Sequence, residues 1–159
     1  HPRLIIPFRD KEGEVFAYQG RAFGNEQPKY ITIKLKDCDK IFGLDRVDTS
    51  KHFYVVEGPI DSLFIDNCLA VGGSDFDRLG YGDFTVIFDN EPRNKEICKQ
   101  IEKIILQGRK IVIWPEELKE KDINDMVLAD LPVEDIIKNN THQGAEAQLR
   151  FAKWRKINV

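Results

Sequence analysis

The sequence predicts an α/β fold in which helices flank a mainly parallel sheet, with a small β-rich module in front of it. After residue 52, short apolar runs alternate with helical stretches, which implies parallel strands joined by crossover helices. Before residue 48, polar turns separate the apolar runs, as is typical of antiparallel strands. At 159 residues, with 42% hydrophobic and 32% charged side chains, the chain suits one globular unit with a sizeable core.

The first module, residues 1–48, begins with a predicted hairpin. "RLIIPF" and "EVFAYQG" flank the polar, glycine-ended stretch "RDKEG", so residues 3–20 are expected to form two antiparallel strands. "YITIK" follows Pro28 and predicts a third short strand. Over residues 1–36 seven bases outnumber four acids, so this module is expected to collect anions on one face.

The second module, residues 49–130, carries the predicted parallel sheet. Its strands are "FYVVE", "LAVGG", "FTVIFD" and "KIVIW", and its helical segments are "PIDSLFIDN" and residues 94–107. In the latter, Ile97, Ile101, Ile104 and Ile105 recur at helical spacing, and Gly108 is placed to end the helix. Residues 131–159 are expected to form a helical extension, with breaks at Pro132 and Gly144. Its "RFAKWRK" predicts a docked helix with a buried tryptophan in preference to a surface that stacks on nucleic acid.

Composition narrows the function classes. Three widely spaced cysteines and three histidines indicate neither a zinc site nor a disulfide framework. No apolar run has the roughly 20 residues that span a bilayer, and the first residues do not resemble a signal peptide. We therefore expect a cytosolic, cytoplasmic protein without a membrane partner.

Carboxylates stand at the ends of the predicted strands. Glu57 ends one strand, Asp89 and Glu91 follow another, and Asp122 comes eight residues after Trp114. Ligands bind beyond the carboxyl ends of parallel strands, and clustered carboxylates with few histidines favour Mg²⁺ or Mn²⁺. Asp61 joins the predicted metal ligands, although in isolation an acid near a helix start is explained by the helix dipole.

The order of these motifs resembles the Toprim domain, the metal-binding catalytic fold of bacterial-type primases, type IA and II topoisomerases and some nucleases. The matching residues are "EGPID", "FDNE" and "KDIND". The lead-in "RLIIPFRDKEGEVFAYQGRAFG" and the junction "IFGLDRVDTSKHFYVVEGPIDSLF" are similar to bacterial and phage primases, in particular those of T-even-type tailed phages. Glu91 replaces the second aspartate of the usual DxD, and Asn124 takes the place of an acid in "KDIND", so Asp122 is preferred over Asp125 as a ligand.

The resemblance implies a DNA primase core, a nucleotidyltransferase that makes short RNA primers on single-stranded DNA at the replication fork. The implied partners are template, NTPs and a replicative helicase, and the chain is expected to be cut from a longer protein. Glu57, Asp89 and Glu91 are the implied catalytic residues. The expected contacts to nucleic acid or NTP are Arg9, Arg21, Lys29, Lys34 and Lys121. A Toprim nuclease, or a nucleic-acid-binding module with a degenerate site, are the alternatives.

Overall fold

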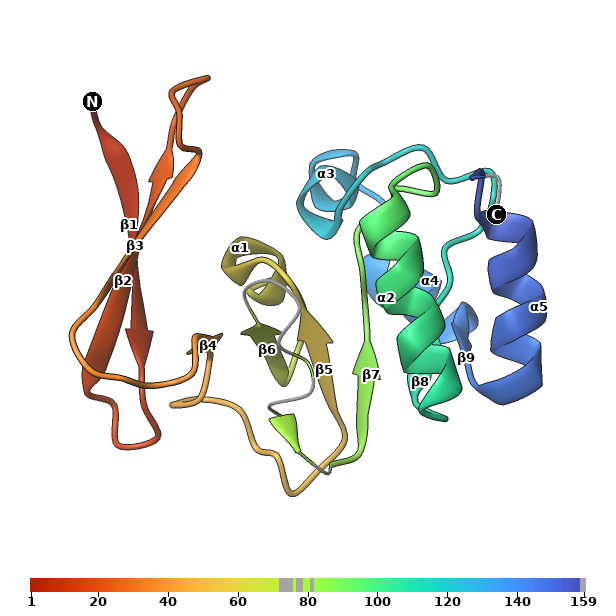
Figure 1. The fold of residues 1–159 in the computed structure, drawn as a ribbon, viewed down its shortest axis with the longest axis horizontal. Coiled ribbons are helices and arrows are strands. Elements are labelled where there is room, and N and C mark those ends of the chain that lie inside the picture. Colours follow the sequence, from red (N-terminus) through yellow and green to blue (C-terminus); the bar gives the residue numbers. More distant parts are fainter. Residues whose placement is uncertain (72–75, 77–78, 81, 158–159) are drawn as a thin grey trace.

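The computed structural model describes residues 1–71, 76, 79–80 and 82–157. Two sheets organise this part of the chain: a three-stranded sheet of order β1-β2-β3 and a six-stranded sheet of order β4-β6-β5-β7-β8-β9. Figure 1 shows the smaller sheet at one end of the molecule, next to α1, and the long helices α2 and α5 at the other. The predicted α/β class, with a small β module in front of a mainly parallel sheet, is confirmed.

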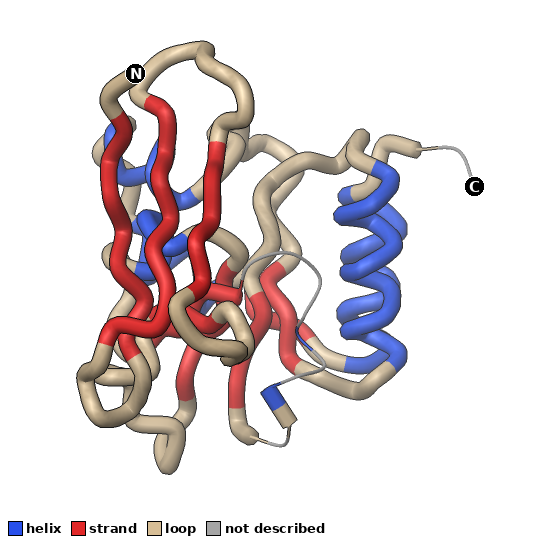
Figure 2. Tube along the Cα trace, turned by 60° about the vertical axis from the view of Figure 1, so that its left-hand side comes forward, coloured by secondary structure: helices blue, strands red, loops and turns tan. Residues whose placement is uncertain are grey.

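The small sheet is an antiparallel meander, which Figure 2 shows face on. Its strands are β1 (Arg3–Arg9), β2 (Val15–Ala22) and β3 (Tyr30–Lys34). The predicted hairpin is present: Asp10 accepts backbone N–H groups from its own turn, and Gly13 has a φ of 85°, which favours glycine. Phe8 and Phe16 are buried beneath this sheet, whereas every residue of β3 is exposed.

The large sheet has a parallel centre and antiparallel edges. In the centre, β5 (Phe53–Val56) lies between β6 (Cys68–Val71) and β7 (Phe84–Val86), and β7 pairs with β8 (Lys110–Val112), all parallel. Apart from the half-buried Tyr54 and the exposed Lys110, the residues of these strands are buried, as expected of a parallel sheet covered by helices. At the edges, β4 (Ile41–Phe42) and β9 (Thr141–His142) are antiparallel. Of the predicted strand "LAVGG", Gly72 and Gly73 lie outside the described residues.

Five helices are described, and their bounds follow from their end residues. α2 (Lys95–Leu106) begins at Asn94, whose side chain accepts the N–H groups of Glu96 and Ile97, and ends before Gly108, which has a φ of 74°. The others are α1 (Pro59–Ser62), α3 (Ile123–Leu128), α4 (Val133–Asn139) and α5 (Gly144–Trp154). Pro132 caps α4 and Gly144 starts α5, so the predicted breaks are confirmed. No described helix is long and apolar enough to cross a membrane.

The segment after Glu57 differs from the prediction. Residues 59–67 were expected to form one helix, but α1 is a single turn that ends at Ser62. The Ser62 hydroxyl donates to the Pro59 carbonyl at 2.6 Å, and the chain then turns through Asn67, which has a φ of 54°, into β6. The side-chain N–H groups of Asn67 donate to the carbonyls of Asp48 and His52, so residues outside the turn hold it in its left-handed conformation.

Substitutions on the buried and the exposed face of α2 test the placement of the hydrophobic core. We expect Ile101→Ala, at a side chain that is 2% exposed, to lower the free energy of unfolding by about 2–5 kcal/mol. Leu106→Ala removes a comparable side chain from the same helix at a position 71% exposed, and its effect is expected to stay within about 0.5 kcal/mol. Urea unfolding followed by circular dichroism measures both; equal losses would contradict the placement of the core.

Candidate catalytic site at the strand ends

The centre of the large sheet positions two acids side by side. β5 and β7 are adjacent and parallel, with Val55 opposite Val86, and Ile87 N–H continues the pairing by donating to the Val55 carbonyl at 2.9 Å. Glu57 follows β5 and Asp89 follows this extended pairing. Because parallel strands end at the same edge, both carboxylates reach the same rim of the sheet, as predicted.

A cavity of about 230 Å³ lies at this rim. Its acidic wall comes from the large sheet and its helices, and its basic wall comes partly from the small sheet, so the two modules form the cavity together. The lining residues are Arg21, Lys29, Tyr30, Glu57, Gly58, Ile60, Asp61, Asp89, Lys121, Asp122 and Asn124. We call this cavity the acidic pocket.

Asp61 reaches across the acidic pocket instead of serving its own helix. Its carboxylate accepts the backbone N–H of Asn124 at 2.9 Å, which connects α1 to the start of α3. A Cβ atom at Gly58 would stand 3.3 Å from Asp61 Oδ2, so glycine leaves room for this carboxylate. The tether to Asn124 shows that Asp61 does more than offset the dipole of a one-turn helix.

Burial and neighbouring negative charges raise the pKa values of the carboxyl groups in the pocket. Burial, followed by the negative charges of Glu57, Asp61, Asp122 and Glu91 in that order, raises the pKa of Asp89 to about 7. The pKa of Asp61 is raised to about 6 by burial, with smaller contributions from Asp122 and Asp125, against the lowering effects of the hydrogen bond from Asn124 and the charge of Arg21. The pKa of Glu57 is raised by burial and then by Glu91 and Asp61. These carboxylates therefore lack enough compensating positive charge.

Glu57 shows most clearly that the pocket suits a cation. Its Oε1 atom is buried and has no hydrogen-bond partner. A buried carboxylate oxygen without a partner is costly unless a cation or a donor reaches it. Within the residues that the structure describes, no three Asp, Glu, His or Cys side chains stand at the spacing of a ready-made metal site. The donor set nevertheless consists of carboxylate oxygens, which is the chemistry that Mg²⁺ and Mn²⁺ prefer.

Lys121 and Asp122 line the acidic pocket, whereas Glu91, which was predicted to be catalytic, is not among the lining residues. Lys121 Nζ lies 3.6 Å from a Glu91 carboxylate oxygen, so the lysine offsets part of the negative charge near Asp89. Asp122 caps α3 by accepting the backbone N–H of Asp125 at 2.8 Å. Asp122 thus both caps α3 and lines the acidic pocket, whereas Asp125 is not among the lining residues.

Asn90 fixes the loop that carries Lys121 and Asp122, a role that is not predicted from its sequence. Its backbone N–H donates to the Lys121 carbonyl, and its side-chain amide donates to the carbonyls of Leu118 and Glu120. Its side-chain oxygen accepts the indole N–H of Trp154 at 2.9 Å. Asn90 therefore connects β7, the loop at 115–122 and α5. The "DNE" motif was interpreted through its acids, and nothing in its local pattern signals these partners.

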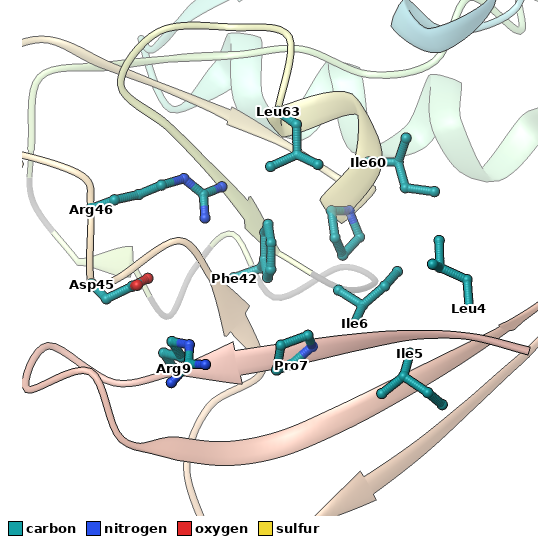
Figure 3. Close-up of a pocket in the computed structure, with 11 residues that line it drawn as sticks. Leu4, Ile5, Ile6, Pro7, Arg9, Phe42, Asp45, Arg46, Ile60 and Leu63 are labelled. Carbon is teal, nitrogen blue, oxygen red and sulfur yellow. The ribbon is translucent and has the colours of Figure 1, made fainter.

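Two predicted basic contacts lie elsewhere. The Arg9 guanidinium donates to the Gly13 carbonyl in the β1–β2 turn, and Arg9 lines a separate, mostly apolar cavity of about 340 Å³ between β1 and α1 (Figure 3). Lys34 is at the far end of β3 from Tyr30 and is not among the lining residues of the acidic pocket. Arg21, Lys29 and Lys121 do line that pocket.

Comparison with known proteins supplies relatives for this arrangement. The chain is 38% identical over 166 residues to the DNA primase of Enterobacteria phage T4, an alignment that covers 98% of this chain and 48% of that protein. The zinc-binding and RNA polymerase domains of Aquifex aeolicus primase match with a TM-score of 0.66 at 21% identity, over 95% of this chain and 43% of that one. A DnaG primase catalytic domain solved with single-stranded DNA matches with a TM-score of 0.62 at 18% identity, over 89% and 52%. No model of a protein family matches.

The likeness to these solved structures shows that the chain has the Toprim-type fold of primase cores. The sequence similarity over nearly the whole chain then identifies it as a relative of the DNA primases, similar to that of phage T4. The chain spans about half the length of this relative.

The contact between Asn90 and Trp154 can be tested by a double-mutant cycle. Asn90→Ala removes three side-chain hydrogen bonds and leaves the indole N–H buried without an acceptor, so we expect a loss of about 1–3 kcal/mol in the free energy of unfolding. Trp154→Phe should cost less in the Asn90→Ala background than in the wild type, with a coupling of at least about 0.5 kcal/mol. Asn25→Ala, in an exposed loop, is the control; strictly additive losses at positions 90 and 154 would contradict the link.

Proposed function

We propose that this chain is the catalytic core of a DNA primase, which joins ribonucleotides into short RNA primers on single-stranded DNA by a metal-dependent nucleotidyl transfer. The observation that carries the proposal is the acidic pocket itself: Glu57, Asp61 and Asp89 converge at the strand ends, with Arg21, Lys29 and Lys121 lining the same cavity. Such a pocket suits a substrate that combines phosphates with divalent cations. The relationship to phage T4 primase supports the same reaction.

The acidic half of the site, which comprises the acidic wall of the pocket and the nearby Glu91, would hold Mg²⁺ or Mn²⁺. The ligands would be Glu57, Asp89 and Glu91, with Asp61 and Asp122 beside them. When bound, a divalent cation supplies activation of a 3′-hydroxyl and neutralisation of a triphosphate. Glu57 Oε1 already lacks a partner, and Asp89 is surrounded by like charges, so both carboxylates gain most from a cation. Glu91 would exchange its contact with Lys121 for that cation and leave the lysine free.

The basic half would hold the phosphates. Arg21 comes from β2, Lys29 directly precedes β3, and Lys121 comes from the loop that Asn90 fixes. Contacts from such side chains to phosphates give affinity that does not depend on base sequence. Arg9 and Lys34, outside the acidic pocket, are proposed to contact more distant template phosphates. Single-stranded DNA and NTPs are the proposed substrates, and a replicative helicase is the proposed partner.

Glu57→Gln tests the acidic half. We expect it to abolish primer synthesis from labelled NTPs on single-stranded DNA with Mg²⁺, because the cation loses a charged ligand. In EDTA the variant should melt higher than the wild type, since one repelling carboxylate is gone, and it should gain less from added Mg²⁺. Glu117→Gln, at an exposed loop glutamate, is the control. Primer synthesis by Glu57→Gln at the wild-type rate would refute the assignment. Cleavage of labelled DNA without primer synthesis by the wild-type protein would indicate a nuclease.

Arg21→Ala tests the basic half. We expect single-stranded DNA or NTP to bind about tenfold more weakly at low salt, because a phosphate contact is lost. The melting temperature should still rise with Mg²⁺, since the carboxylates are intact. Arg150→Ala, at an exposed arginine of α5, is the matched control. Fluorescence anisotropy and thermal melting measure the two effects; unchanged affinity would remove Arg21 from the binding surface.

A further inference from the structure

Tyr30 is an exposed aromatic side chain on the rim of the acidic pocket. It is 43% exposed and lines the pocket together with Arg21 and Lys29. The β2–β3 register places it directly opposite Arg21, on the face of the small sheet that carries this arginine. The motifs of the acids and the basic residues do not account for an aromatic ring at this position.

Two cationic groups hold the Tyr30 ring in place. The Arg21 guanidinium donates to the tyrosine hydroxyl at 3.3 Å, and Lys29 Nζ lies 5.8 Å from the ring centroid. The backbone around the ring is also tied, because Ala22 N–H and the Arg3 guanidinium both donate to the Lys29 carbonyl. A ring held at its hydroxyl and approached by a lysine, yet still substantially open to solvent, can receive a flat ligand without much further ordering.

We propose that Tyr30 is a stacking platform for the base of a nucleotide whose phosphates lie against Arg21, Lys29 and Lys121. This inference rests on the proposed function, because it takes the ligand of the acidic pocket to be a nucleotide. Bases stack on aromatic side chains largely without regard to sequence, and adjacent cations bind the backbone, so the combination suits single-stranded nucleic acid or NTP. The shared chemistry is a nucleobase with attached phosphate, supplied by the template or by the incoming nucleotide.

The platform can be separated from a role in positioning Arg21. Tyr30→Leu removes the ring, whereas Tyr30→Phe keeps the ring and removes the hydrogen bond to Arg21. Tyr18→Leu is the matched control: Tyr18 is 38% exposed on β2, and the register places it opposite Pro7 and Ile33, on the other face of the sheet from Arg21 and Tyr30.

The experiment compares binding of a labelled oligothymidylate, an abasic oligonucleotide of the same length, ATP and inorganic tripolyphosphate, with Mg²⁺ throughout. We expect Tyr30→Leu to weaken binding of oligothymidylate or ATP at least about fivefold. Its binding of the abasic strand or tripolyphosphate should stay unchanged, because their phosphate contacts remain. Tyr30→Phe and Tyr18→Leu should bind like the wild type. A loss confined to oligothymidylate identifies the template base as the ligand, and a loss confined to ATP identifies the incoming nucleotide.

Three results would overturn the inference while leaving the proposed function standing. First, Tyr30→Leu could bind both base-containing probes as tightly as the wild type does. Second, Tyr30→Leu could lose the same affinity for the probes with a base as for those without one. Third, Tyr30→Phe could lose as much affinity as Tyr30→Leu. The last would show that the hydroxyl acts through Arg21. If the wild-type protein bound neither oligothymidylate nor ATP, the proposed function and this inference would both fail.

Discussion

Mutual repulsion among partly buried carboxylates is the constraint around which this molecule is organised. The parallel pairing of β5 and β7 brings Glu57 and Asp89 to one rim, where burial and neighbouring acids raise the pKa of both. Carboxylates in this setting are stabilised by bound cations, by donors or by protonation. The protein supplies some compensation through the Asn124 N–H to Asp61 and through Lys121 beside Glu91. What remains uncompensated, above all at Glu57 Oε1, is the basis for proposing a metal.

The two sheets depend on one another at this rim. The large sheet alone would present an acidic surface to solvent, and the small sheet alone would present exposed basic and aromatic side chains. Together they enclose a cavity with charges of both signs, because Arg21 and Lys29 reach the acids of the larger module. The charge polarity along the sequence thus becomes a charge polarity across a pocket, which suits a ligand that itself combines phosphates with cations.

The sequence predicted those features that follow from local pattern. Alternating apolar runs gave the strands, the isoleucine spacing gave α2, and the acids at strand ends gave most of the pocket's acidic wall. It could not predict long-range partners: Asn90 looks like a turn residue until the fold brings Leu118, Glu120 and Trp154 to it. The two-residue edge strands β4 and β9 are too short to show a period. Arg9 fits equally well as a surface charge of the hairpin turn, and its guanidinium donates to the Gly13 carbonyl of that turn instead of lining the acidic pocket. Charge indicated which residues are candidates for binding anions, while the tertiary structure decided which of these candidates share the cavity.

The hydrogen bond between Trp154 and Asn90 also bears on where this unit can be cut. Trp154 is near the end of α5, far in sequence from the acids, yet its indole occupies the oxygen of the residue that orders the loop at Lys121 and Asp122. A shortened version that keeps every strand and every acid but stops before α5 would retain the apparent catalytic motif while losing the brace behind it. A fragment that keeps this hydrogen bond must therefore extend to Trp154 in the last helix, well beyond Asp122, the last acid that lines the pocket.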